Sequence, residues 1–187
     1  MLSPCKLGDL NVVKTILKSD YDIYEKDKRG RNGFMVGCVN GHLNIVKYLV
    51  EINYNINEKD NDGMNGFMVA CDDGHLNIVK YLVEINYNIH EKDNDGMNGF
   101  MYACDYNYLN IVIYLLEHGC EINEEYIKTI ERNESLCTQI KNRMEQIHTF
   151  YDEIDKNLND IDIRVVHEIK VFTYGLQNLK KLAIKFQ

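Results

Sequence analysis

The chain has 187 residues, a net charge of −8, six cysteines and a single proline. The acidic balance disfavours nucleic-acid binding, which requires a basic face. No apolar stretch approaches the length of a membrane span, and the N-terminus lacks the pattern of a secretory signal. We therefore expect an intracellular, cytoplasmic protein with neither a membrane nor a nucleic-acid partner, and its cysteines fit a reducing compartment.

The sequence Asn-Gly-Phe-Met occurs at residues 32–35, 65–68 and 98–101, a step of 33 residues each time. Residues 27–59 and 60–92 differ at only seven positions. A period of this length is typical of a stacked array, because one short unit cannot bury its own apolar face. The repeat predicts units at 27–59, 60–92 and 93–125, preceded by a truncated unit at 1–26.

Each unit is predicted to be a turn, a helix, a second turn and a second helix. In the unit 60–92, residues 60–63 form a turn that ends in Gly63, where φ is expected to be positive. Asn65 then stands at a helix N-cap, and Gly74 ends that short helix. Residues 75–83 have apolar side chains at helical spacing, and Asn86 follows as a residue that tolerates left-handed geometry.

These positions resemble the ankyrin repeat, and they agree in register at Asp60, Gly63, Ala70, Gly74, His75, Ile78, Val79 and Leu82. The resemblance implies an all-α fold, an ankyrin-repeat α-solenoid, over residues 1–125. The family's Thr-Pro-Leu-His is altered here to Asn-Gly-Phe-Met. Because Gly lacks the preset φ of Pro and Met cannot make the hydrogen bonds of His, we expect softer repeats than the family ideal. The repeat phrases are also similar to those of short ankyrin-repeat proteins of large DNA viruses that infect amoebae, which would place the chain in a host cytoplasm.

No pattern in the sequence indicates an enzyme, a cofactor or a metal site. Cys5, Cys38, Cys71 and Cys104 share one repeat position and are expected to form a ladder of small buried side chains. Stacked repeats lie too far apart for neighbouring members of that ladder to form disulfides. The run from Glu58 to Gly63 resembles the start of a calcium loop, but the twelfth position, which requires Glu, is Val69.

Residues 126–187 leave the repeat and are predicted to be helical. Asn123 is expected to cap a helix, and residues 133–135 indicate an interruption. Apolar residues then recur at spacings of four and three, as in a coiled-coil-like seam. Two arrangements fit this pattern. One is a single long helix that pairs with another chain, and the other is a helical hairpin that turns near residues 157–160. The hairpin is favoured because those residues have poor helix propensity. Ile113 replaces the Lys of the other units, so we expect the C-terminal segment to cover it.

Ankyrin proteins typically bind partners through their turn tips and the inner face of each first helix. The repeats of this chain differ mainly at those positions. This predicts a groove that is basic at its N-terminal end and acidic in its middle and at its C-terminal end, with Met64 and Met97 exposed and, together with Tyr106, available for apolar contacts. The predicted partner-binding residues are Lys28, Arg29, Arg31, Asn61, Asp62, Met64, Asp72, Asp73, Asn94, Asp95, Met97, Tyr102, Asp105 and Tyr106.

The predicted function is a non-catalytic adaptor that binds a host or viral partner protein through this groove and makes a second contact through its C-terminal segment. The alternative is a structural component of a larger, possibly viral, assembly, with self-association through residues 133–187.

Overall fold

The computed structural model describes residues 2–19, 25–118, 120 and 123–155. Two compact parts divide the chain, residues 1–102 and residues 103–187. Within the described residues every regular element is a helix, which confirms the predicted all-α solenoid. The first part contains α1 (Leu2–Leu7), α2 (Leu10–Ile16), α3 (Gly33–Val39), α4 (Leu43–Glu51), α5 (Gly66–Asp72), α6 (Leu76–Glu84) and the start of α7 (Gly99–Asp105).

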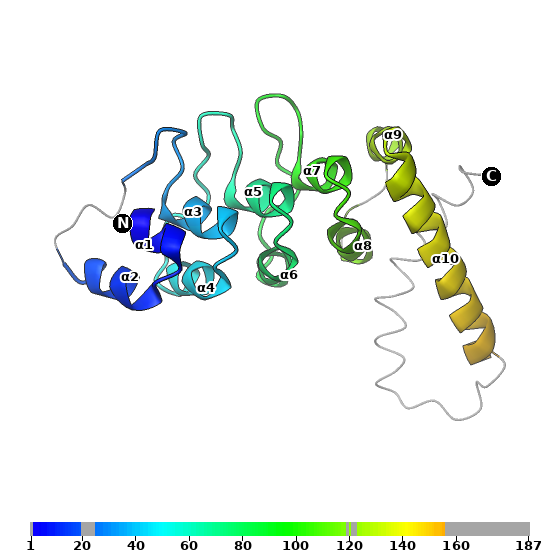
Figure 1. Ribbon diagram of the computed structural model, residues 1–187, viewed down its shortest axis with the longest axis horizontal. Helices are drawn as coiled ribbons and strands as arrows, with labels where there is room; N and C mark the ends of the chain where they lie inside the picture. The colour runs from blue at the N-terminus through cyan, green and yellow to red at the C-terminus, as the bar shows by residue number, and fades with distance from the viewer. Residues whose placement is uncertain (1, 20–24, 119, 121–122, 156–187) are drawn as a thin grey trace. The chain divides into compact units, whose positions relative to one another are not determined.

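The helices of the first part stack as pairs in two rows. Helices α1, α3 and α5 contact one another in that order, and so do α2, α4 and α6. Each member of one row also contacts its partner in the other row. The loops that lead into α3, α5 and α7 extend to the same side of the rows, at the top of Figure 1. This arrangement places three successive turns beside one another along one edge.

An asparagine starts the first helix of each repeat. The side chain of Asn32 accepts a hydrogen bond from the Met35 amide, and Asn65 accepts one from Met68, both at 3.0 Å. Both asparagines have extended φ and ψ and are buried. A helix of seven residues is too short to be stable alone, so a cap and tertiary packing are both needed. The predicted cap at Asn65 is confirmed.

The three residues of the unit 60–92 that are predicted to have left-handed geometry have positive φ values. Gly63 has a φ of 82°, Gly74 a φ of 76° and Asn86 a φ of 57°. Asn53, the equivalent of Asn86 in the preceding repeat, has a φ of 55°. Because asparagine tolerates left-handed geometry better than most residues, it can end the second helix of these two repeats without a glycine.

The core shows why Gly and Phe occur together in the repeat motif. Phe34 and Phe67 are almost fully buried. A β-carbon placed on Gly66 would lie 2.8 Å from Cδ1 of Phe34, and one on Gly99 would lie 2.5 Å from Cε1 of Phe67. The ring of one repeat therefore packs directly on the first helical residue of the next, at a place where proline would not fit.

Histidines also link the repeats. The Nε2 atom of His42 lies 2.9 Å from the carbonyl oxygen of Lys6, and that of His75 lies 2.8 Å from the carbonyl oxygen of Val39. A carbonyl only accepts, so each Nε2 carries the proton that it donates. The two rings therefore tie each second helix to the first helix of the preceding repeat.

The second part holds the end of α7, then α8 (Leu109–Glu117), α9 (Glu124–Arg132) and α10 (Glu134–Asp155). Asn123 caps α9 by accepting from the Tyr126 amide, as predicted. Asn133 separates α9 from α10: its Oδ1 accepts from the Leu136 amide, and its Nδ2 donates to the carbonyl oxygen of Cys104 at 3.0 Å. The predicted interruption at residues 133–135 is confirmed, and this one residue also anchors α10 to the end of α7.

The face of α8 that carries Ile113 is covered. Ile113 is 9% exposed, and α10 contacts α8 within the second part, as the exchange of Lys for Ile predicts. Leu136 and Ile140, the first two residues of the predicted seam, are fully buried. The predicted hairpin turn at residues 157–160 lies outside the described residues.

All six cysteines are free, and five of them are buried. Burial raises the pKa of Cys5 to about 11 and that of Cys120 to about 12. The four ladder cysteines therefore behave as small apolar side chains.

Candidate partner-binding surface

Each turn tip is held by its own aspartate. The Oδ1 atom of Asp60 accepts hydrogen bonds from the amides of Asp62 at 3.0 Å and Met64 at 2.9 Å. Asp27 and Asp93 make the same pair of bonds in the other two tips. The side chains at the second and third tip positions are left exposed, namely those of Lys28, Arg29, Asn61, Asp62, Asn94 and Asp95. A rigid tip presents these predicted binding residues at little cost in conformational entropy.

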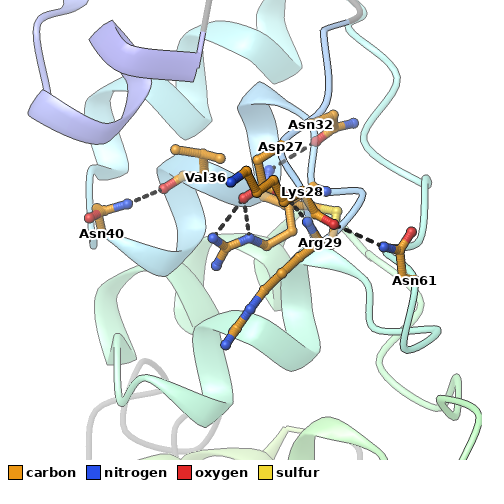
Figure 2. A network of polar contacts seen from close by, with 9 residues as sticks. Asp27, Lys28, Arg29, Asn32, Val36, Asn40 and Asn61 are labelled. Atoms are coloured by element: carbon orange, nitrogen blue, oxygen red, sulfur yellow. Dashed lines mark hydrogen bonds and ion pairs between the residues drawn. The ribbon is translucent and has the colours of Figure 1, made fainter.

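Successive tips are joined by a ladder of hydrogen bonds. Asn61 donates its side-chain Nδ2 to the carbonyl oxygen of Lys28 at 3.2 Å (Figure 2). Its main-chain amide donates to the carbonyl oxygen of Arg29 at 2.9 Å. Asn94 repeats the pattern on Asn61 and Asp62, at 3.2 and 3.0 Å. Two ion pairs, Lys26 with Glu58 and Lys59 with Glu91, run parallel to the ladder. The carboxamides of Asn61 and Asn94, predicted to contact a partner, thus donate to the preceding tip.

The fifth tip position differs from the sequence prediction. Met64 and Met97 are half-buried rather than exposed, and the main-chain amide of each donates to the aspartate that begins its turn. In the first tip this position is Arg31, which forms an ion pair with Asp27 at 2.7 Å. Burial alone would raise the pKa of Asp27, but hydrogen bonds and charge from Arg31 outweigh burial and lower it. The two methionines therefore offer only part of their surface to a partner.

The basic side chains of the first tip act electrostatically on the acidic residues at the end of α5. Asp72 ends α5 and Asp73 is its C-cap, a place where the helix dipole disfavours negative charge. Burial raises the pKa of both carboxyl groups, and Asp73 raises that of Asp72 further. The charge of Arg29 opposes the rise in both pKa values, and the charges of His75 and Arg31 oppose the rise at Asp73, so the first tip lies within electrostatic range of the end of α5. We call this surface, which carries both basic and acidic side chains, the mixed-charge face.

Replacing both Asp72 and Asp73 with asparagine is expected to stabilise the protein at pH 7. The pKa values of both carboxyl groups are raised in the folded state, so folding favours their protonated forms. The stability that this contributes is fully present below the unfolded-state pKa and is lost as pH rises through the folded-state pKa. The gain should stay below about 1 kcal/mol because both side chains are partly solvated. Urea unfolding at pH 7 and pH 3 measures this gain. If the free energy of unfolding differed between variant and wild type by the same amount at both pH values, this explanation would be contradicted.

Tyr102 joins the same face from the first helix of the third repeat. It takes the position of Val36 and Val69, and its hydroxyl donates a hydrogen bond to Oδ2 of Asp93. Burial raises the pKa of Tyr102, and the bond to Asp93 and the charges of Asp93, Asp72 and Asp95 raise it further. Three carboxylates and one phenol therefore converge where the third tip meets the helices.

Tyr102→Phe should lower the free energy of unfolding by about 1 kcal/mol, because it removes one hydrogen bond to a charged group at a partly exposed site. Urea unfolding of the variant measures this loss. Tyr106→Phe is the matched control, since Tyr106 is 57% exposed and stacks on Tyr108 with ring centres 6.2 Å apart. Equal effects of the two changes would show that the bond to Asp93 contributes nothing to stability.

The remaining predicted residues, Asp105 and Tyr106, belong to the second part of the chain. Asp105 is the last residue of α7, and both side chains are exposed. Among the described residues, no three His, Cys, Asp or Glu side chains form a group suited to a metal ion. No helix among the described residues has both the length and the apolar character needed to cross a membrane.

The repeats match a known family. A family profile described as ankyrin repeats (3 copies) matches residues 2–93 and again residues 34–126. The chain belongs to the ankyrin-repeat family, whose members generally mediate protein–protein interactions. No curated protein matches the chain.

Proposed function

We propose that the chain is a non-catalytic adaptor that binds a partner protein across its turn tips and the adjoining ends of α3 and α5. One comparison carries this proposal. Residues 27–59 and 60–92 differ at seven positions, and the only buried pair among them is Gly37 and Ala70. The other six pairs are exposed or half-buried, and five of them lie on the tips and helix ends. The array thus keeps its internal contacts constant and varies the surface that a partner would read.

The mixed charge of this face favours a partner of mixed charge. Arg29 and Arg31 would meet acidic groups, while Asp72, Asp73 and Asp95 would meet basic ones. Because Asp72 and Asp73 stand at a helix C-terminus and carry raised pKa values, a bound cation would relieve an unfavourable charge there. Complementary charge of this kind sets the rate and specificity of association more than raw affinity.

Affinity capture with charge-reversed variants tests the proposal. The bait is the full chain, incubated with a lysate of the cells that make it, and captured proteins are quantified by mass spectrometry. Asp62→Lys/Asp73→Lys changes two exposed side chains on the proposed face, and Glu51→Lys/Glu84→Lys makes the same change in charge on α4 and α6. We expect a protein that the control retains and the first variant loses by about tenfold or more. An identical set of captured proteins for both variants would contradict the proposed face.

Three finer expectations belong to this proposal. The free thiols favour a partner in a reducing, intracellular compartment. Origin in a virus, with a partner from host or virus, stays a prediction from the repeat phrases. The third expectation is self-association through residues 133–187. Light scattering on the intact chain tests this expectation, and a monomer at high concentration would contradict it.

A further inference from the structure

The ladder of turn tips has an open end at the third tip. In the first two tips, the carbonyl oxygens at the second and third positions accept from the next tip's asparagine. The equivalent atoms of the third tip are the carbonyl oxygens of Asn94 and Asp95, and neither accepts a hydrogen bond within the described part of the chain. The third tip therefore repeats an acceptor pair that is filled twice elsewhere in the array.

The space beside these acceptors is open as well. A β-carbon on Gly30 or Gly63 would lie 2.5 Å from Oδ1 of the asparagine in the following tip. Gly96 has nearly the same φ, 81°, yet nothing among the described residues lies within 4 Å of a β-carbon placed there. We call the two carbonyl oxygens of Asn94 and Asp95, together with the open side of Gly96, the amide slot.

The described part of the chain has no fourth tip at the next repeat position. The residues that stand 33 positions after Asn94 and Gly96 are Ile127 and Thr129, and both belong to helix α9. A second copy of the chain does not fit either. Its first tip has Lys28 where an asparagine is required, and the carboxamides of Asn61 and Asn94 already donate within their own array.

We propose that the amide slot binds a partner protein through an asparagine presented in a turn. The carboxamide of that asparagine would donate to the Asn94 carbonyl oxygen and its main-chain amide to the Asp95 carbonyl oxygen. Its Oδ1 would lie against Gly96, as the oxygens of Asn61 and Asn94 lie against the two preceding glycines. An aspartate could not replace it, because a carboxylate offers no donor and the Asp95 side chain would repel it.

The slot shares the third tip with the mixed-charge face of the proposed function, but it uses different atoms. It consists of main-chain atoms at the outer edge of one tip, whereas the proposed face depends on side chains of several tips and helix ends. Two neutral hydrogen bonds give weak binding on their own, with a dissociation constant of about 1 mM or higher. The slot would therefore set the orientation of a partner and exclude wrong ones, while most of the affinity comes from other contacts.

Nuclear magnetic resonance on the isotope-labelled full chain tests the slot directly. The probe is a cyclic peptide with the sequence of residues 59–65, Lys-Asp-Asn-Asp-Gly-Met-Asn, which carries the asparagine in its natural turn. We expect saturable shifts of the amide signals of Asp95, Gly96 and Met97, and none at Gly30, whose neighbouring acceptors are already filled. The same peptide with Asp in place of the first asparagine should bind about tenfold more weakly.

A variant of the protein provides the second arm. Gly96→Asn places a side chain in the slot at a left-handed position that asparagine tolerates, so the fold should survive. An unchanged amide spectrum outside the third tip will verify this, and the variant should lose peptide binding by about tenfold or more. Absence of shifts at Gly96, or equal binding of both peptides, would overturn the amide slot. Neither outcome bears on the charge-reversal experiment, so the two proposals can fail separately.

Discussion

Gly66→Ala should lower the free energy of unfolding by about 2–3 kcal/mol, although alanine is the better helix former by about 1 kcal/mol. The new methyl group would stand 2.8 Å from Cδ1 of Phe34 and 3.3 Å from Sγ of Cys38. Phe34 and Cys38 are fully buried, so neither side chain can move away without opening the interface between the repeats. Urea unfolding of the variant and the wild type measures the loss.

A double-mutant cycle identifies the cause of this loss. Phe34→Leu shortens the side chain that meets Gly66, and the pair Gly66→Ala/Phe34→Leu should be less damaging than the sum of its parts by about 1 kcal/mol or more. Additive effects would mean that the backbone at residue 66, and not the ring of Phe34, requires glycine. A variant as stable as wild type would show that the close packing seen here is not needed for the fold.

Gly63→Ala and Gly96→Ala should differ strongly, although both replace a glycine at the same position of a turn. Their φ values are 82° and 81°, so the cost of left-handed geometry, about 1–2 kcal/mol, is common to both. Only at Gly63 does the methyl group also meet a neighbour, since Oδ1 of Asn94 would lie 2.5 Å away and its main-chain nitrogen 2.8 Å away. Gly63→Ala should therefore cost about 1–3 kcal/mol more than Gly96→Ala.

Thermal and urea unfolding of the two variants side by side measures this difference. Asn94→Ala in the Gly63→Ala background serves as the control, because it removes the side chain that the methyl group meets and should recover part of the loss. Equal destabilisation by the two glycine substitutions would show that the third tip is as crowded as the second, and it would also remove the basis of the amide slot.

Much of the fold can be predicted from the sequence because the same capping and turn residues occur at equivalent positions in several repeats. Asn65 before a short apolar run predicts a cap, and Gly63, Gly74 and Asn86 predict left-handed turns, all of which the structure contains. The interruption at Asn133 is likewise local, since a capping residue ends one helix pattern and starts the next. Such features depend on neighbours within a few positions, which a single sequence displays directly.

Features between repeats were harder to predict. The glycine after the capping asparagine predicts a weaker helix. In the structure, however, Gly66 is the residue on which Phe34 of the preceding repeat packs. Met64 is predicted to be an exposed anchor, but in the structure its side chain is half-buried. The proximity of Arg29 to Asp72 depends on how far one repeat is displaced from the next, and no pattern within one unit encodes that displacement.

The asparagine and histidine hydrogen bonds between neighbouring repeats in the first part span a nearly constant length of chain. The asparagine ladder joins residues 33 apart, and the histidine bonds join residues 36 apart. The chain therefore never has to close a loop much longer than one repeat while it folds, and loop closure is the step that slows proteins rich in distant contacts. Folding can start at any repeat pair and spread in both directions, so we expect this part of the chain to fold quickly for its length and to unfold from its ends.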